Sequence, residues 1–395
     1  MKNTEKELIN RISTSELDRR WDAVRQMMNA NGIDYLIVRN DEDYLGGNIK
    51  WFCDTWAQNG YPLMAVFPVD DEITLIAHGP DMEDDPSPKN QNYGIKARLT
   101  APHLPSLNYS AGYEAELAMG ILKKKKGALI GLVGKSFIPV SFIEHLQKHL
   151  PDLKFVDVTE LIDEIKVIKS PEEIAHIRVT AGLHDLVIEH IRKIIKPGIK
   201  AYEVYAEARY AATVNGSEQG IVMVGSGPSG SPIPFMGLPS QNRVLKEGDQ
   251  LSVLIEINGP SGFYAEIGRV FSIGEPSQEL HDAFETSLEA QKIVLEMMRP
   301  GVSPKDLVDA SNNFLEKHGY FPEKRLFAHG QGYDLVERPA IRADDPMLLK
   351  AGMNIAVHPC ASNKSVWAVV CDNYIVTEGG VSECLHKTPK EVIVV

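Results

Sequence analysis

The sequence lacks or is short of three features that would place a chain in a specialised class. No apolar run is long enough to span a bilayer, and cysteines and cationic residues are both scarce. Its 41 lysines and arginines stand against 54 aspartates and glutamates, which gives a formal net charge of −13. Since nucleic acids and anionic membranes select basic surfaces, this charge balance argues against both as partners.

Cysteine usage is equally sparse. The four cysteines, at positions 53, 360, 371 and 384, form no CxxC pair and no zinc-ribbon spacing. The first residues, MKNTEKELINRIS, are charged and lack the apolar core of a signal peptide. We therefore expect a reduced chain located in the cytoplasm. A length of 395 residues suits two domains.

Strand-like and helical segments alternate in the first part of the chain, residues 1–165. Buried strands are predicted from apolar runs at 35–38, 62–67, 73–78 and 128–134. Helices are predicted at 15–32 and 140–150, whereas residues 79–112 fit neither pattern. This alternation predicts an α/β domain over residues 1–165.

A helix start marks the passage to a second domain, which we assign to residues 166–395. Ser170 suits the N-cap, and Pro171 suits the first helical position. Beyond it lies an internal repeat, because IIKPGIKAYEV (194–204) resembles MMRPGVSPKDL (297–307). Two copies of helix, Pro-Gly, helix and strands predict a pseudo-twofold domain with a cleft between its halves.

Polar and titratable residues interrupt strand-like segments of this second domain. Glu256 and Glu266 lie on two arms of an apolar hairpin, and His329 precedes closely spaced glycines. His358 ends the apolar run of AGMNIAVHP, and Cys371 breaks another. Each has an ordinary explanation alone, such as a solvent-facing carboxylate, a turn histidine or a core cysteine. Together they are the residue types of metal ligation, acid–base catalysis and nucleophilic catalysis.

The order of the segments resembles the family of creatinase, prolidase, aminopeptidase P and methionine aminopeptidase, which shares the "pita-bread" fold. The resemblance covers nearly the whole chain. It rests on IKSPEEIAHIR, LKEGDQLSVLIE, YAEIGRVF, AHGQGYDLVERP, AGMNIAVHP and VCDNYIVTEGG, taken in this order. It implies a creatinase-type amino-terminal α/β domain, a carboxy-terminal pita-bread domain and a homodimer.

The resemblance also implies where the metal ligands of the family fall. Its two bridging aspartates fall at Glu256, where Leu254 competes for the register, and at Glu266, and its ligand histidine is His329. His358 and Cys371 stand where relatives have glutamates, so the site is closer to creatinase-like members with altered ligands. Two hard divalent cations need bridging carboxylates, and these two replacements disfavour a dinuclear centre.

Several interpretations of the site remain open. In the preferred one, no metal is bound, His358 or His329 is the base, Glu266 orients it, and Cys371 is a potential nucleophile. In a second, Glu266, His329, His358 and Cys371, with Glu256 as a further candidate, hold one Zn or Fe ion in a hydrolase or lyase. The chain also fits an Xaa-Pro-type peptidase, or a pita-bread protein that binds peptides without catalysis.

Substrate-contacting residues are assigned on thinner grounds. Tyr61 stands where creatinase reaches across its dimer, and Trp56 near it suggests an aromatic wall. Met236 and Glu337 fall in substrate-contacting segments of the family, and Arg338 suits a carboxylate. We expect a hydrolase that cleaves a C–N bond of a small, non-peptide molecule.

Overall fold

The computed structural model describes residues 10–40, 47–55, 60–79, 93–240 and 242–395, and Trp56 lies outside these ranges. The chain divides into two compact units, one of residues 11–166 and one built on residues 167–395. Asn10 belongs with the second unit, and its backbone N–H donates to the carbonyl of Pro260 at 2.8 Å. Within the described part, no helix combines the length and apolarity that crossing a bilayer takes.

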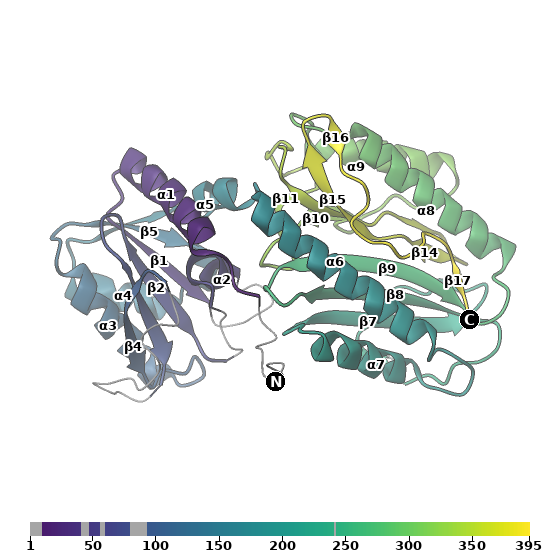
Figure 1. The fold of residues 1–395 in the computed structure, drawn as a ribbon, viewed down its shortest axis with the longest axis horizontal. Helices are drawn as coiled ribbons and strands as arrows, with labels where there is room; N and C mark the ends of the chain where they lie inside the picture. The colour runs from purple at the N-terminus through teal and green to yellow at the C-terminus, as the bar shows by residue number, and fades with distance from the viewer. Residues whose placement is uncertain (1–9, 41–46, 56–59, 80–92, 241) are drawn as a thin grey trace, which may run out of the picture. The chain divides into compact units, whose positions relative to one another are not determined.

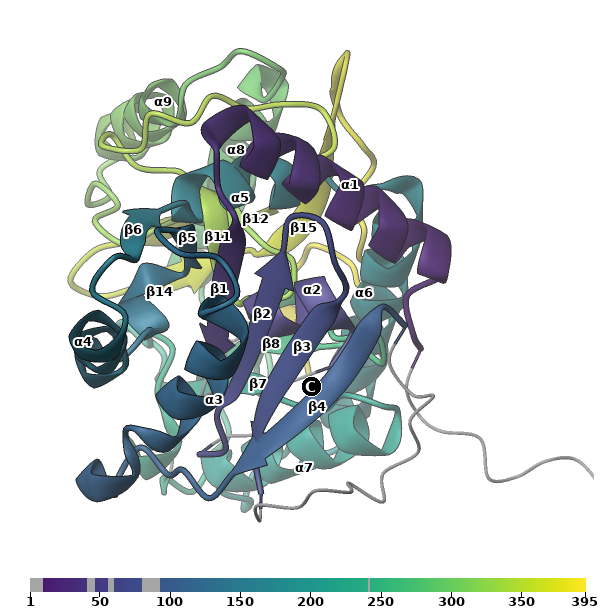
Figure 2. The same cartoon turned by 90° about the vertical axis from the view of Figure 1, so that its left-hand side faces the viewer.

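The amino-terminal unit is an α/β fold. Its elements are α1 (Thr14–Asn31), β1 (Tyr35–Asn40), α2 (Gly47–Cys53), β2 (Leu63–Pro68), β3 (Ile73–His78), β4 (Ile95–Ala101), α3 (Tyr113–Leu122), β5 (Leu129–Val133), α4 (Val140–His149), β6 (Lys154–Asp157) and α5 (Thr159–Lys166), with 3₁₀ turns at Asn108–Ser110 and Lys135–Phe137. The strands follow the order β4-β3-β2-β1-β5-β6 in one sheet. Figure 2 shows β2, β3 and β4 side by side.

This sheet is mixed, and its central strand is buried on both faces. β1 pairs antiparallel with β2 and parallel with β5. Alternate β1 residues such as Tyr35 and Ile37 pack with Phe142 and Leu146 of α4. The apolar run of β1 is therefore continuous rather than alternating, as strands covered on both faces are. The predicted α/β domain is confirmed, and β4 falls inside the segment 79–112 that the sequence patterns did not assign.

The described part of the carboxy-terminal unit contains a four-stranded sheet, a five-stranded sheet and a two-stranded ribbon, with two pairs of helices beside them (Figure 1). Its elements are α6 (Pro171–Arg192), α7 (Ala201–Val214), β7 (Gly220–Pro228), β8 (Asp249–Asn258), β9 (Tyr264–Ser272), α8 (Gln278–Met297), α9 (Pro304–Lys317), β10 (Ala328–Gly330), β11 (Glu337–Ala340), β12 (Asn354–Val357), β13 (Cys360–Ser362), β14 (Trp367–Val369), β15 (Asp372–Thr377), β16 (Gly380–Val381) and β17 (Ile393–Val394), with a 3₁₀ turn at Leu238–Ser240.

The predicted repeat corresponds to these two halves. Helices α6 and α7 pack on the sheet of order β17-β9-β8-β7, and α8 and α9 pack on each other beside the strands of the second half. The second half holds the sheet β11-β10-β12-β15-β16 and the ribbon β13-β14. Each Pro-Gly motif lies in the turn between the helices of a pair, at Gly198 and Gly301, both with positive φ. Glycine adopts this backbone conformation at no steric cost.

The start of α6 is the one that the sequence predicts. The Ser170 side chain accepts a hydrogen bond from the backbone of Glu173 at 3.2 Å, and the Glu173 carboxylate accepts one from Ser170 at 2.7 Å. This capping box satisfies two backbone donors that a helix start otherwise leaves unpaired, and Pro171 follows at the first position. The helix therefore begins at a defined residue directly after the inter-unit boundary.

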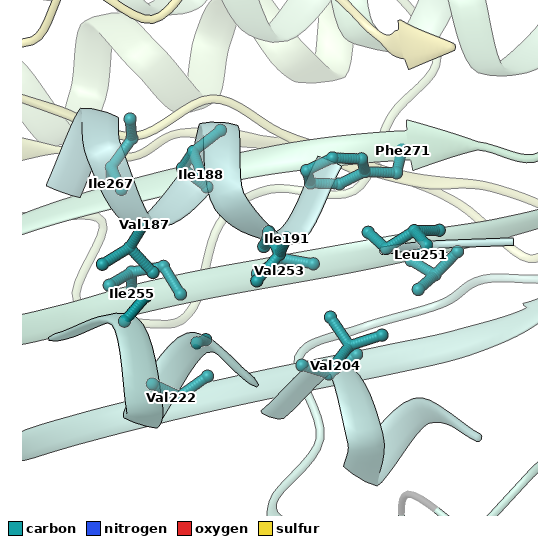
Figure 3. Packing of buried hydrophobic residues seen from close by; sticks show 14 of the residues in the cluster. Val187, Ile188, Ile191, Val204, Val222, Leu251, Val253, Ile255, Ile267 and Phe271 are labelled. Carbon is teal, nitrogen blue, oxygen red and sulfur yellow. The ribbon is translucent and has the colours of Figure 1, made fainter. Parts of the chain in front are cut away.

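The core of the first half lies between α6, α7 and the sheet. Figure 3 shows Val187, Ile188 and Ile191 of α6 facing strand residues that include Val253 and Ile255 of β8. These side chains are at most 2% exposed. Burial of such residues is the main favourable term that holds α6 on the sheet.

We expect Val187→Ala to lower the free energy of unfolding by about 2 kcal/mol, because it opens a cavity among buried side chains. Val179→Ala is the matched control, since Val179 lies on the same helix and is 49% exposed. That change should stay within about 0.5 kcal/mol. Urea unfolding followed by circular dichroism measures both, and equal effects would contradict the packing described here.

Candidate active site

Three titratable side chains from different strands meet in the carboxy-terminal unit. Glu266 is on β9, His329 is on β10, and His358 directly follows β12. Their potential ligand atoms all lie within 4.8 Å of one another, and each residue is at most 5% exposed. His329 Nε2 lies 3.3 Å from Glu266 Oε2, and the two imidazole centroids are 5.3 Å apart. We call Glu266, His329 and His358 the triad.

His358 has no polar partner for its ring among the residues that the structure describes. Both of its ring nitrogens are buried, and neither forms a hydrogen bond with any described residue. Its backbone N–H donates to Phe327 O at 2.7 Å, so the backbone of His358 is held while its ring is not. Buried polar atoms are rarely left unpaired, because each costs about 1–3 kcal/mol when desolvated. These two nitrogens are therefore available to a ligand.

The other imidazole is oriented by the backbone. Nδ1 of His329 lies 3.1 Å from the carbonyl of Gly330, so this nitrogen carries a proton and donates it. In the neutral ring, Nε2 then presents a lone pair to the carboxylate of Glu266. Two acceptors at 3.3 Å need a proton or a cation between them. Metal-binding histidines usually donate their other ring N–H in this way, to a backbone carbonyl or a carboxylate.

Glu256 stands directly opposite Glu266 across the β8–β9 hairpin. Burial raises the pKa of Glu256 well above its usual range, and the nearby charge of Glu266 raises it further. Burial would also raise the pKa of Glu266, but His358 and His329 outweigh this and lower it to about 2. These opposite shifts favour the protonated form of Glu256 and the ionised form of Glu266.

Burial has the opposite effect on an imidazole. It lowers the pKa of His358 to about 4, although the carboxylate of Glu266 acts in the other direction. His358 is therefore neutral at pH 7, and its ring offers a lone pair rather than a charge. A neutral imidazole is the form that ligates metal ions.

Cys371 packs beside the triad without joining it. Its residue is fully buried, and its thiol points to the backbone carbonyl of Glu266 at 3.6 Å. Burial raises the pKa of this thiol well above its usual range, and Glu266 and Asp372 raise it further. The thiolate, which is the nucleophilic and metal-binding form, is therefore disfavoured here.

A cavity of about 380 Å³ opens over the triad. Its walls are mostly apolar, with one cation, and consist of Met223, Pro234, Phe235, Leu254, Glu256, Glu266, Arg325, Leu326, His329, Val336, His358 and Trp367. The rings of Phe235 and Trp367 meet edge to face at 4.8 Å. A small apolar cavity with a few convergent polar groups is the usual form of a small-molecule site.

Several residues that the sequence assigned to substrate binding do not line this cavity. Glu337 forms a buried ion pair with Lys169 at 2.6 Å, and Arg338 pairs with Asp345 at 2.6 Å. The backbone carbonyl of Met236 accepts from Val224, and its neighbour Phe235 lines the cavity instead. The assignments of these three residues to substrate binding stay predictions, and in the structure Glu337 and Arg338 form ion pairs within the carboxy-terminal unit.

The two remaining assignments concern the amino-terminal unit. Tyr61 is 47% exposed, and its ring meets His78 edge-on with centroids 4.8 Å apart. Trp56 lies outside the described residues. Sequence reasoning missed Arg325 and Trp367, because an apolar strand residue and a charged loop residue look ordinary before the fold brings them together.

A buried amide network supports the triad from behind. Gln331 donates to Glu256 Oε1 at 2.9 Å and accepts from the Asn373 side chain at 2.8 Å. The Asn373 side-chain oxygen accepts from the backbone N–H of Glu266 at 2.7 Å, and Asn354 accepts from Asn373 at 3.2 Å. These amides are at most 1% exposed. They fix the two glutamates relative to β12 and β15, and so keep the triad in its geometry.

A fully buried ion pair joins β9 to β15. Arg269 of β9 donates to Asp372 of β15 at 2.7 Å, and both side chains are 0% exposed. The guanidinium also donates to the carbonyls of Cys371 and Thr388. Burial opposes ionisation of Asp372, but Arg269 and His386 outweigh it and hold its pKa below the usual range.

Comparisons with known proteins identify the family of the chain. The model of "Metallopeptidase family M24" matches residues 175–378, and that of the "Creatinase/Prolidase N-terminal domain" matches residues 20–168. The chain belongs to metallopeptidase family M24. The match confirms the predicted family and fold and places the chain among hydrolases that cleave C–N bonds. The expectation that no metal is used is not supported, because the family is one of metallopeptidases.

Two relatives illustrate the similarity in sequence. The Xaa-Pro dipeptidase of Pyrococcus horikoshii is 29% identical over 303 residues, which are 74% of this chain and 85% of the relative. The probable dipeptidase PepE of Mycobacterium tuberculosis is 31% identical over 244 residues, which are 60% and 63% of the two chains.

Solved structures show the same fold at lower identity. The X-Pro aminopeptidase from Thermotoga maritima superposes with a TM-score of 0.78 at 21% identity, covering 95% of this chain and 99% of that one. The prolidase from Pyrococcus horikoshii gives 0.76 at 22% identity, covering 95% and 100%.

We expect Arg269→Met to lower the free energy of unfolding by about 3–5 kcal/mol, because it leaves Asp372 charged and buried. The double variant Arg269→Met/Asp372→Leu should be more stable than the single variant, since no uncompensated charge remains. Urea unfolding of both, with Arg342→Met as a surface control, measures the effect. Arg342 pairs with Asp344 at a position where both side chains are at least 60% exposed. A double variant that is less stable than the single one would contradict this account.

The thiols should be inert in the folded protein. Cys53, Cys360 and Cys371 are at most 2% exposed, and burial raises the pKa of each. We expect iodoacetamide at pH 8 to label none of them before unfolding, whereas Cys384, which is partly exposed, reacts slowly. Peptide mapping by mass spectrometry reads out each site. Rapid native labelling of Cys371 would restore it as a candidate nucleophile.

Proposed function

We propose that this chain hydrolyses an amide C–N bond of a small substrate at a centre with one metal ion held by the triad. The observation that carries the proposal is the buried His358 ring, whose two nitrogens have no partner among the described residues. Relatives named as dipeptidases favour an amide bond over the non-peptide bond that the sequence suggested.

The donor set does not fit two metal ions. Of the five positions implied by the family resemblance, only Glu266, His329 and His358 gather within 4.8 Å. Glu256 accepts a hydrogen bond from Gln331 and is not part of this group. Cys371 does not bring its sulfur into the group either, and burial raises the pKa of its thiol. Two divalent cations would thus share a single carboxylate of the triad, which is too little to neutralise and bridge both.

The same residues fit a single ion. Two neutral imidazoles and one carboxylate form a common three-residue set for catalytic Zn and for Fe(II). An ion at this place would take one nitrogen of the His358 ring as a ligand and separate the facing acceptors of His329 and Glu266. When bound, the ion supplies Lewis acidity, which lowers the pKa of water and polarises a carbonyl.

The chain's own residues supply the remaining chemistry. The raised pKa of Glu256 favours its protonated form, which in this proposal donates the proton to the nitrogen that leaves. Gln331 fixes the position of that carboxyl group through its hydrogen bond. The apolar walls, which include Phe235, Leu254 and Trp367, exclude water from the reacting groups. The homodimer and the cytoplasmic location stay predictions.

Metal content measured by plasma mass spectrometry tests the proposal. We expect about one equivalent of Zn or Fe per chain, and amide hydrolysis that is lost on chelation and restored by one equivalent. His358→Leu should weaken metal affinity by at least about 100-fold. This loss exceeds the one expected when a residue that only orients a metal ligand is removed. Glu256→Gln and Cys371→Ser are controls that should keep the ion, because neither residue belongs to the triad.

Three further outcomes would each point to a different chemistry. Two equivalents of metal, both lost in Cys371→Ser, would show a dinuclear centre and contradict the proposal. Full amide hydrolysis by metal-free protein would restore acid–base catalysis with His358 as base. Retention of metal without turnover of any amide would favour a lyase or a binding protein.

A further inference from the structure

The cavity over the triad contains one cation that the proposed chemistry does not use. Arg325 lies on the segment before β10, and its side chain is 40% exposed. Its Nη2 lies 3.5 Å from the backbone carbonyl of His358. The guanidinium also lies 5.6 Å from the ring centroid of Trp367. The charge therefore stands next to the triad and against the aromatic wall.

Part of this guanidinium has no partner within the described part of the chain. Nε and Nη2 donate to Glu323 at 3.0 Å and 2.6 Å. No described residue accepts a hydrogen bond from Nη1, which carries two N–H groups. Glu323 thus fixes the orientation of the guanidinium, and Nη1 stays available to a ligand. An arginine held in this way is well suited to binding a carboxylate.

The cavity offers no matching site for a cation among its described lining residues. Its two carboxyl groups are those of Glu256 and Glu266, which are bound to Gln331 and faced by His329. The other described lining residues, apart from Arg325 and the two histidines, are apolar. A free ammonium group would find no unengaged carboxylate there, and Arg325 would repel it.

We propose that the site selects substrates that carry a carboxylate and an apolar group but no free amine, that is, N-acyl amino acids. The carboxylate binds Nη1 of Arg325, and the apolar side chain lies against Phe235 and Trp367. This inference rests on the proposed amide hydrolysis for the reaction, but the charge selection is separable from it. It departs from the free dipeptides that the names of the relatives specify.

The reaction balances without a further reactant. Water adds to the acyl carbon, the C–N bond breaks, and the nitrogen takes a proton. The products are a carboxylic acid and a free amino acid. The chain contributes the anchoring of the carboxylate, which orients the scissile bond over the triad.

The first arm of the test measures binding without turnover. The probes are 3-phenylpropionate and 3-phenylpropan-1-ol, which share the ring and differ in charge, and calorimetry gives their Kd values. Glu323→Gln keeps Arg325 and should bind the acid within about threefold of the wild type. Arg325→Gln/Glu323→Gln leaves no unpaired charge behind and should raise the Kd of the acid about 10-fold or more. The Kd of the alcohol should not change, which also confirms that the cavity is intact.

The second arm compares N-acetyl-L-phenylalanine with L-alanyl-L-phenylalanine, which both release phenylalanine. We expect kcat/KM to favour the acetylated compound by at least about 10-fold with metal-loaded protein. A higher kcat/KM for the dipeptide contradicts the amine-free substrate class. In the first arm, an equal rise in the Kd of the acid and of the alcohol in the double variant contradicts the role of Arg325. The protein could hydrolyse neither compound and still bind the acid through Arg325 in the first arm. That result would contradict the proposed function but support the carboxylate site at Arg325.

Discussion

The geometry of the candidate site depends on the close approach of β9 and β15, one from each half of the carboxy-terminal unit. Gly268 and Cys371 exchange two backbone hydrogen bonds of 3.2 Å, and a Cβ on Gly268 would come within 2.9 Å of the Cys371 Cβ. Only glycine permits this contact, and the Arg269–Asp372 pair beside it fixes it in place. Glu266 lies two residues before the contact, and β15 pairs with β12, which His358 directly follows. One junction thus sets the distance between triad residues of both halves.

This dependence explains what the sequence could predict. Glu266, His329 and His358 each interrupt or end an apolar strand. Once the repeat predicts a cleft between two halves, a place on such a strand indicates which side chains lie near that cleft. The cavity walls were less accessible to such reasoning. Trp367 and Phe235 look like core residues, because nothing in their local pattern tells a cavity wall from a packed interior. Arg325 is anchored by Glu323 two residues away, which resembles any surface ion pair until the fold places it beside His358.

Three candidate residues have surroundings that the sequence does not show. Glu337 was assigned from its place in a segment of the family, and Arg338 as a cation suited to a carboxylate, yet each pairs with a partner distant in sequence or across a turn. Cys371 was chosen for its type, but a thiol without solvent or a cation beside it stays protonated. Charge and reactivity depend on surroundings that sequence order does not give. The positions were therefore easier to predict than the protonation states.

The charge of the site relates its altered ligand positions to the number of metal ions that it can hold. The resemblance implies glutamates where this chain has His358 and Cys371, so the site would carry two negative charges fewer, and the burial of Glu256 beside Glu266 favours its protonated form. A single ionised carboxylate beside two neutral donors can compensate part of one divalent charge and very little of a second. In the proposed mechanism, the carboxyl group of Glu256 supplies the proton that a metal-bridging carboxylate could not supply. The proposed centre thus has one Lewis acid and one Brønsted acid, where a dinuclear centre has two Lewis acids.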